Sequence, residues 1–201
     1  MKKILLTLAI CITGFCFAQK DYIITIDGKD YEVSLNEKQN IKINGKAVDV
    51  TVKQKDTITH TDDYFNFKYT KDHKITKAEI ESGVEQLMLV TAGGTGVIIQ
   101  SYDFLDPSML KEMMLNEVTK ESISYGYKME RKDYDLTLAS GEKIRILKAV
   151  LEYRGEVEIY EVAAHGKKDE GILIMTMDMN LTTNDGGKDM IKLMWDSIEM
   201  K

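Results

Sequence analysis

Apolar and polar residues alternate along much of the chain after residue 20, and a period of two residues is typical of half-buried β-strands. The alternation recurs in residues 24–35 and 41–52, where two strands flank a two-residue turn. The turn dipeptides, Asp27-Gly28 and Asn44-Gly45, suit a type I′ turn because both of its central residues have positive φ. We therefore predict two β-hairpins, joined as a four-stranded meander, over residues 19–57.

These two turns also fix which residues face one another. With Asp27-Gly28 as the loop, Ile24 faces Tyr31, and in the second copy Ile41 faces Val48. The apolar side chains of each hairpin then share one face. Four short strands are marginally stable alone, so the unit either packs on the rest of the chain or docks a partner. Packing is the favoured alternative, and it predicts a loss of stability when the hairpins are removed.

A main domain is predicted over residues 58–201, and strands outnumber helices in it. Residues 54–63 are polar and indicate a connector, while residues 70–82 leave open a loop or a short strand that ends near Ile80. Strands are predicted at residues 64–69, 84–91, 97–104, 127–132, 134–138, 143–153, 156–164 and 171–179.

Two helices interrupt these strands. The first follows Asp106, a good N-cap, and Pro107, which suits the first helical position; Gly126 ends the region. Its predicted apolar stripe consists of Met109, Leu110, Met113, Met114 and Val118. The second helix is predicted at residues 185–199 with Asp185 as cap, and its apolar face consists of Met190, Ile191, Met194, Trp195 and Ile198.

This order of elements predicts an α+β fold. The turns between the late strands are too short for parallel crossovers, so these strands form an antiparallel meander. One helix between two sets of strands and one at the end predict an α/β/α sandwich, an antiparallel sheet flanked by helices and preceded by the hairpin pair.

The same order resembles the PsbP-like and DcrB-like family over about residues 60–200. The resemblance rests on the aromatic strand at 64–69, the glycine turn before Val97-Ile98-Ile99-Gln100, the Asp106-Pro107 helix and the closing helix with Trp195. It implies a PsbP-like α/β/α sandwich and a compact, non-catalytic envelope domain that serves in assembly or binding. It carries over no functional residue.

The first eighteen residues have the layout of a cleavable signal peptide. Lys2 and Lys3 precede an apolar run at residues 4–17, which is too short to span a bilayer comfortably. Cys16 and Ala18 stand at the third and first positions before the predicted cut, where small side chains are required. The site resembles that of exported proteins of the Bacteroidetes group, and it predicts a periplasmic or extracellular protein.

A lipoprotein is the alternative, but it needs a small residue directly before the lipidated cysteine, and Ile10 and Phe15 stand there instead. Both cysteines lie in the predicted signal peptide, so cysteine-based catalysis and zinc fingers are excluded for the mature chain. Loss of Lys2 and Lys3 lowers the formal net charge from −6 to −8. An acidic chain without a basic stripe does not indicate nucleic-acid binding, and no second apolar run predicts a transmembrane segment.

Several residues are candidate sites. The segment Thr91-Ala92-Gly93-Gly94-Thr95-Gly96 precedes a strand, so it predicts a hairpin turn and not a phosphate loop. Met175, Met177 and Met179 point to one face of a strand and form a weak candidate for Cu(I), although packing in the core is the favoured interpretation. The three histidines lack a metal-ligand spacing and are expected at the surface; they are His60, His73 and His165.

No nucleophile motif of a known hydrolase type is present. Tyrosines 125, 127, 153 and 160 form a possible carbohydrate platform, although strand tyrosines usually pack. We therefore predict a non-catalytic, exported envelope protein without a cofactor. Its expected partner, an envelope protein or a small apolar ligand, binds through an apolar groove or through the hairpins. An envelope hydrolase with a carboxylate or histidine base is the alternative, and Cu(I) binding a weaker one.

Overall fold

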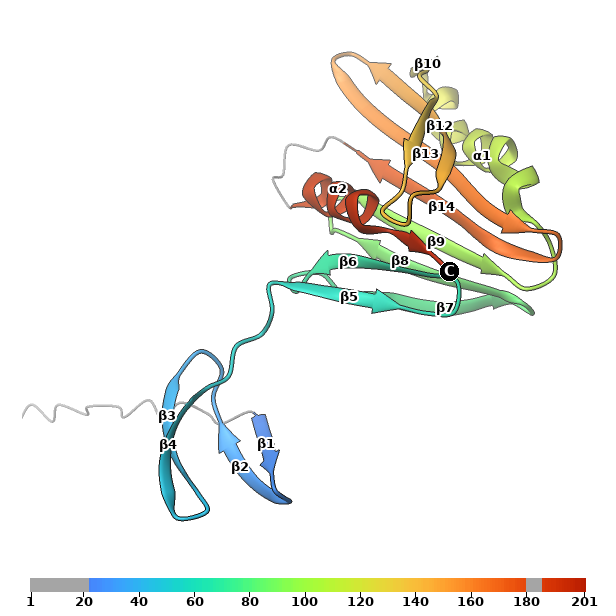
Figure 1. The fold of residues 1–201 in the computed structure, drawn as a ribbon. Coiled ribbons are helices and arrows are strands. Elements are labelled where there is room, and N and C mark those ends of the chain that lie inside the picture. Colours follow the sequence, from blue (N-terminus) through green and yellow to red (C-terminus); the bar gives the residue numbers. More distant parts are fainter. Residues whose placement is uncertain (1–21, 180–185) are drawn as a thin grey trace, which may run out of the picture. The chain divides into compact units, whose positions relative to one another are not determined.

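The computed structural model describes residues 22–179 and 186–201 (Figure 1). The predicted signal peptide at residues 1–18 and the predicted cap Asp185 lie outside the described residues. The chain divides into two compact units, Met1–Gln54 and Lys55–Lys201, and each is described by itself.

The first unit contains the two predicted hairpins. Strand β1 (Tyr22–Ile26) pairs with β2 (Lys29–Val33), and β3 (Lys38–Ile43) pairs with β4 (Lys46–Thr51). The turn residues have the positive φ that a type I′ turn requires, 50° and 74° in the first turn and 50° and 81° in the second. The predicted registers are confirmed, since Ile24 pairs with Tyr31 and Ile41 with Val48.

The predicted four-stranded meander is wrong. The two hairpins are separate two-stranded sheets, linked by a single parallel bridge between Leu35 and Val52. Asn36, with φ 61°, turns the chain after β2, and its N–H donates to the Val52 carbonyl at 2.8 Å. This left-handed residue redirects the chain, and β3 does not continue beside β2 as a meander requires.

The second unit is built around a large antiparallel sheet. Its strand order is β10-β12-β13-β14-β9-β8-β7, and β11 also pairs with β12. The late strands pair through tight turns, as predicted. The bounds are β7 Thr76–Glu81, β8 Val84–Val90, β9 Gly96–Tyr102, β10 Lys128–Arg131, β11 Tyr134–Thr137, β12 Lys143–Tyr153, β13 Glu156–Lys167 and β14 Glu170–Asp178.

Between β9 and β10 the chain forms a 3₁₀ turn, η1 (Pro107–Leu110), and helix α1 (Lys111–Tyr125). The predicted cap is confirmed, because Asp106 Oδ1 accepts the Ser108 N–H at 2.8 Å. The predicted apolar stripe is partly wrong: Met109 and Met113 are 75% and 57% exposed. The 3₁₀ turn has three residues per turn and shifts the phase of the helix, so α1 buries Leu115 and Thr119 most deeply. Leu110, Met114 and Val118 of the predicted stripe are partly buried against the cluster that contains Leu115.

The chain ends in α2 (Gly187–Ser197) and a short strand, β15 (Glu199–Met200). The predicted apolar face of α2 is confirmed, since Met190, Met194 and Ile198 are fully buried. Strand β15 pairs with β6 (Phe65–Thr70), which also pairs with β5 (Thr57–Thr61). The predicted connector at residues 54–63 is therefore wrong over β5. No helix in the described part of the chain is long and apolar enough to cross a membrane.

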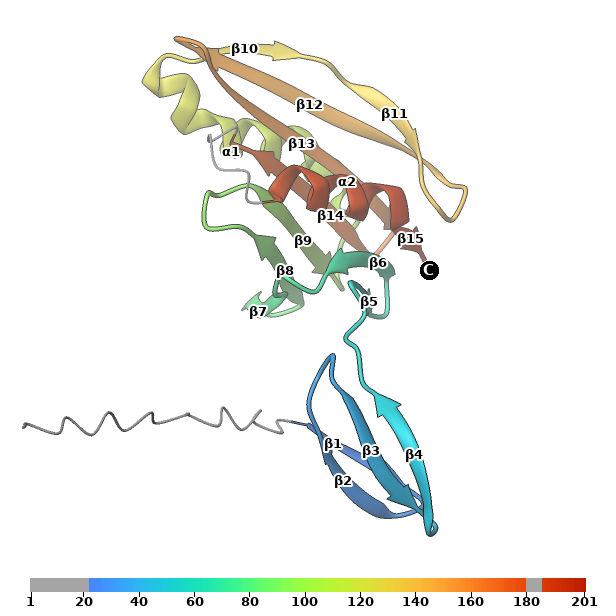
Figure 2. The same cartoon turned by 90° about the vertical axis from the view of Figure 1, so that its left-hand side faces the viewer.

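The large sheet buries a different set of side chains on each face. In β14, Ile172 and Ile174 join a cluster with α2 and β6, whereas Leu173 between them joins a cluster with Leu115 of α1. Because side chains alternate along a strand, α1 and α2 lie on opposite faces. Figure 2 shows α2 in front of β13 and β14.

The predicted fold class, an α+β sandwich whose sheet is flanked by helices, is wrong. Strands account for 56% of the described residues and helices for 17%, so the fold is β-rich. An 11-residue helix such as α2 is only about 16 Å long and cannot cover an eight-stranded sheet. The sheet of β15, β6 and β5 contributes Phe65 and Phe67 to the buried cluster that α2 also joins, and it covers much of the sheet face that α2 leaves open.

A buried carboxylate fastens α2 to the sheet. Glu161 of β13 accepts hydrogen bonds from Tyr134 Oη at 3.1 Å, Lys148 Nζ at 3.0 Å, Thr176 Oγ1 at 3.2 Å and Trp195 Nε1 at 3.2 Å. Burial, together with the charge of Glu161, raises the pKa of Tyr134. A buried charge is tolerated when its lone pairs are satisfied, and this one joins four strands to α2.

Candidate functional site

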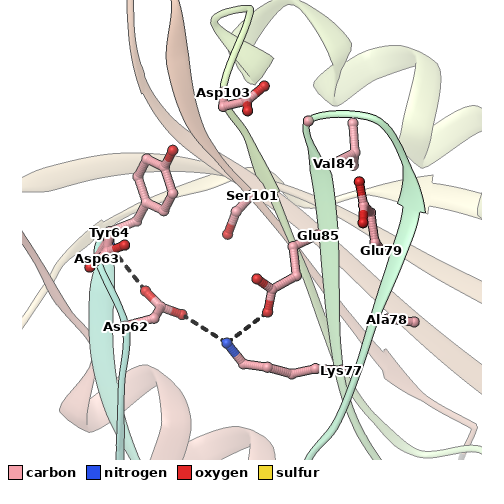
Figure 3. A pocket seen from close by; sticks show the side chains of 11 residues that line it. Asp62, Asp63, Tyr64, Lys77, Ala78, Glu79, Val84, Glu85, Ser101 and Asp103 are labelled. Carbon is pink, nitrogen blue, oxygen red and sulfur yellow. Dashed lines mark hydrogen bonds and ion pairs between the residues drawn. The ribbon is translucent and has the colours of Figure 1, made fainter.

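An acidic cleft of about 470 Å³ lies on the second unit (Figure 3). One wall is the segment between β5 and β6, and the other consists of β7, β8 and β9. The lining residues include five carboxylates, one lysine, a tyrosine and a serine: Asp62, Asp63, Glu79, Glu85, Asp103, Lys77, Tyr64 and Ser101. We refer to this feature as the acidic cleft.

The first wall is held by Asp62. Its Oδ1 accepts the backbone N–H groups of Tyr64 at 3.0 Å and Phe65 at 3.1 Å, so the side chain closes the turn into β6. Phe65 is fully buried and anchors this turn. Lys201 reinforces it, because its N–H donates to the Tyr64 carbonyl at 3.0 Å and its Nζ donates to the Asp62 carbonyl. This wall is therefore preformed.

The second wall depends on the turn between β7 and β8. Gly83 has φ 81°, and a Cβ there would lie 2.0 Å from Asp103 Oδ1. The positive φ favours glycine at this turn, a Cβ would push the Asp103 side chain away, and the Asp103 N–H donates to the Gly83 carbonyl at 3.1 Å. Lys77 on β7 pairs with Glu85 Oε1 at 2.7 Å, and its Nζ stands 4.0 Å from Asp62 Oδ2. Figure 3 shows this lysine between the two walls.

Negative charge in the cleft exceeds positive charge. Lys77 is the single cation among the lining residues. Within the described residues, no ion-pair partner is found for Asp63, Glu79 or Asp103. Burial, and then the nearby carboxylates, raise the pKa of Tyr64. The cleft favours a bound cation, since the negative charge of its carboxylates is not balanced by the one lysine that lines it.

The cleft offers carboxylates and two hydroxyl groups for chemistry. No histidine or cysteine lines it, and its hydroxyl groups are those of Tyr64 and Ser101, with a backbone-anchored Asp62 nearby. A nucleophile needs a base within hydrogen-bond reach, and among the described residues no such partner of Ser101 is found. The groups present are suited to binding polar or cationic ligands.

The three histidines lie apart. His60 Nε2 is 3.2 Å from Asp62 Oδ2, and its ring packs against Phe65 and Phe67 at centroid distances of 5.9 and 5.6 Å. His73 Nδ1 is 2.7 Å from Thr70 Oγ1, and His165 Nε2 is 3.9 Å from Glu142 Oε1. All three side chains are part-buried, so the expectation of solvated surface histidines is wrong, most clearly for His60. The described residues contain no group of three or more His, Cys, Asp or Glu side chains suited to a metal ion.

The candidate methionines share one face of β14, as predicted. Met175 is buried in the cluster beneath α1, and Met177 and Met179 are half-buried against the same cluster. Met179 Sδ accepts a hydrogen bond from Tyr160 Oη at 3.6 Å. Burial in this cluster agrees with a packing role, and Cu(I) binding stays a prediction.

The remaining candidates are the glycine-rich segment at residues 91–96 and the four tyrosines. Residues 91–96 form the turn between β8 and β9, with the Thr91 N–H donating to the Thr95 carbonyl at 2.9 Å, so the hairpin prediction is confirmed. Among the tyrosines, Tyr125, Tyr127 and Tyr153 come together, whereas Tyr160 is buried and bonds to Glu158 at 3.0 Å.

Sequence reasoning missed the acidic cleft because its first wall was assigned to a connector. The signal was present in β5: Ile58 and His60 alternate with threonines 57, 59 and 61, and threonine is a strong β-former. A strand at this place puts Asp62-Asp63-Tyr64 in a tight turn between two paired strands.

No protein-family model matches the chain, and no curated protein matches it. The resemblance to PsbP-like and DcrB-like proteins stays a prediction from the order of the sequence pattern.

Proposed function

We propose that this chain is a non-catalytic binding protein of the cell envelope, and that the acidic cleft receives a cationic group of its partner. The observation that carries the proposal is the charge imbalance of a preformed cleft: five carboxylates face one ammonium group. Carboxylates that stay unpaired in the free protein gain a partner when a cation binds. The occupant is therefore a basic segment of an envelope protein.

Binding is favoured over hydrolysis by the position of the bases. His60 is engaged by Asp62 and enclosed by two phenylalanines, and it does not line the cleft. One carboxylate oxygen of Asp62 accepts hydrogen bonds from two backbone N–H groups. Both groups have a structural task, and in the described part of the chain none of the other four carboxylates of the cleft is hydrogen-bonded to the hydroxyl group of Ser101 or Tyr64.

Export is the second part of the proposal, and it rests on the pattern of residues 1–18 alone. The mature chain is expected to begin at Gln19 and to carry no lipid. Intact-mass measurement of protein recovered from the envelope or medium checks this. A mass that includes diacylglycerol on Cys11 or Cys16 would show a lipoprotein instead.

The cleft is tested with pentalysine as a cationic probe and pentaglutamate as its opposite, by isothermal titration of the mature chain. We expect pentalysine to bind and its affinity to fall with added salt. The double variant Glu79→Gln/Asp103→Asn removes two unpaired charges, each worth about 0.2–1 kcal/mol at an exposed site. It should weaken pentalysine binding about fivefold.

The matched control is Glu117→Gln/Glu121→Gln on α1, which changes the net charge by the same amount on a solvent-exposed helix face. It should leave the affinity unchanged within about twofold. Equal weakening in both double variants would show attraction to the net charge of the protein, and the cleft would not be the site.

A further inference from the structure

Three tyrosines meet where α1 ends and β12 turns into β13. Gly126, with φ 118°, ends α1, and its N–H and that of Tyr127 donate to the Ser122 carbonyl. This glycine cap places Tyr125 and Tyr127 on either side of a sharp bend. A Cβ on Gly126 would lie 3.4 Å from Tyr153 Cε2, so the ring of Tyr153 rests on the glycine backbone.

The rings hold one another in place. Tyr153 is central: its centroid lies 5.3 Å from that of Tyr125, edge to face, and 5.4 Å from that of Tyr127. The Arg154 guanidinium lies 5.0 Å from the Tyr153 centroid, and Tyr127 Oη donates to Glu156 Oε2 at 2.9 Å. Mutual contacts of this kind stabilise aromatic pairs and restrict their rotation.

The cluster is open to solvent, unlike an aromatic core. Tyr125 is 71% exposed, and Tyr127 and Tyr153 are half-buried. Tyr153 is also part of the wall of a hollow of about 540 Å³ formed by β10 and β12. The charged side chains of that hollow comprise two bases and two acids: Lys128, Arg154, Glu130 and Glu152.

We infer that this tyrosine platform, Tyr125, Tyr127 and Tyr153 with the adjoining hollow, binds a neutral pyranose oligosaccharide. The sugar presents its C–H face to the exposed rings and its hydroxyl groups to the acids and bases of the hollow. The site is separate from the acidic cleft, and it does not rest on the function proposed for that cleft.

The chemistry of the surface selects this class of ligand. Tyrosine has an apolar ring and a polar tip, which matches a sugar that has both kinds of surface. Sugar hydroxyls both donate and accept, so a rim that mixes donors and acceptors satisfies them. The two acids and two bases of the hollow balance one another, so the hollow itself has no net charge to attract an ionic ligand, and Glu156 beside it is hydrogen-bonded to Tyr127. Rings already fixed by their neighbours lose little entropy on binding.

The probes are cellohexaose, chitohexaose and laminarihexaose, titrated into the mature chain and followed by calorimetry and by NMR of backbone amides. We expect at least one hexasaccharide to bind and to shift the amides of residues 125–128 and 152–155. Tyr125→Ala should weaken that binding at least tenfold, a change of about 1.4 kcal/mol. Tyr125→Phe keeps the ring and should bind within about twofold of the wild type.

Tyr22→Ala is the matched control, because Tyr22 is an exposed tyrosine of the first unit, 46% exposed. It should not change the affinity, and neither should the double variant of the acidic cleft. Tyr125 is outside both buried clusters, so its alanine variant is expected to fold, which its melting temperature verifies. The inference is wrong if none of the three hexasaccharides binds, if Tyr125→Ala binds like the wild type, or if a sulfated heparin hexasaccharide binds instead of the neutral sugars.

Discussion

The charged side chains around Arg131 show how single residues hold the second unit together. The Arg131 guanidinium lies 3.0 Å from Glu112 Oε2 on α1 and 2.8 Å from Asp133 Oδ2 between β10 and β11. Asp133 also accepts the Lys148 N–H of β12 at 3.0 Å. The hydrogen bond from Arg131 is the largest cause that lowers the pKa of Asp133. Asp133 thus joins the β10–β11 link to β12, and Arg131 joins the same link to α1.

This gives a pH-dependent prediction at the residue scale. Because the pKa of Asp133 is lower in the folded protein than in the unfolded chain, where it is about 3.9, its stabilisation is present above about pH 4. The stabilisation is lost as the pH falls through the lower folded value. Asp133→Asn should therefore lower the free energy of unfolding by about 1–2 kcal/mol at pH 7. The deficit should shrink at pH 3, as measured by urea unfolding at the two pH values.

Asp135→Asn is the control for this measurement. Asp135 pairs with Arg145 at 3.1 Å, but its side chain is 69% exposed, so the variant should lose less than about 1 kcal/mol at either pH. An Asp133→Asn deficit that is the same at pH 3 and pH 7 would contradict the electrostatic role of Asp133.

Residue-level function was only partly accessible from sequence. The shared face of Met175, Met177 and Met179 follows from strand periodicity, which is local. The acidic cleft does not follow from any local pattern, because its carboxylates come from the β5–β6 turn, β7, β8 and the end of β9. Acidic residues are abundant in this chain, so no single one stands out until long-range pairing brings five together. The contacts of Glu161 with four other elements are equally invisible to a local pattern.

At the scale of elements, the strongest predictions came from turns. Asp27-Gly28 and Asn44-Gly45 specify backbone angles, and the angles fix the register of the strands that follow. The strands at residues 143–153 and 156–164 were found for the same reason, since Arg154-Gly155 is a left-handed pair with φ 53° and 89°. Turn chemistry is local, and sequence reports it directly.

Elements without such signals were misjudged. Strand β5 has threonine on its exposed side and carries only Ile58 and His60 on its half-buried side, so its composition is that of a polar loop. The predicted apolar stripe of η1 and α1 is also partly wrong, because Met109 and Met113 are exposed. Helical periodicity predicts a continuous stripe from Met109 onward, whereas the 3₁₀ turn resets the phase before α1 begins.

At the scale of the whole molecule, the fold class depended on contacts that no local pattern contains. Strand β15 pairs with β6 although the two strands are far apart in the sequence: Glu199 of β15 is the partner of Asn66 of β6. This pairing completes the small sheet that, together with α2, lies over one face of the large sheet. Counting helices and strands along the chain predicted helical layers, but it could not show which elements would cover which face.

The last prediction concerns the independence of the second unit. The sequence favours packing of the hairpins on the main domain, because exposed apolar faces are unfavourable. The structure shows that the second unit has a hydrophobic core of its own, because the residues of both buried clusters lie between Phe65 and Ile198. Residues 55–201 should therefore unfold cooperatively, with a melting temperature within a few degrees of that of residues 19–201.

A second truncation makes this test sharp. A chain of residues 58–201 starts inside β5 and lacks Asp56, whose carboxylate lies 2.7 Å from Lys71 Nζ and whose carbonyl accepts the Lys71 N–H at 3.0 Å. It also lacks Thr57, which pairs with Thr70. This chain should melt below residues 55–201, since the edge of the β5–β6 pair frays when its first residues are gone. Circular dichroism at increasing temperature compares the three chains. If residues 55–201 melt far below residues 19–201, the hairpins stabilise the second unit and its independence is disproved. If residues 55–201 and 58–201 melt at the same temperature, the residues at the start of β5 do not contribute to stability.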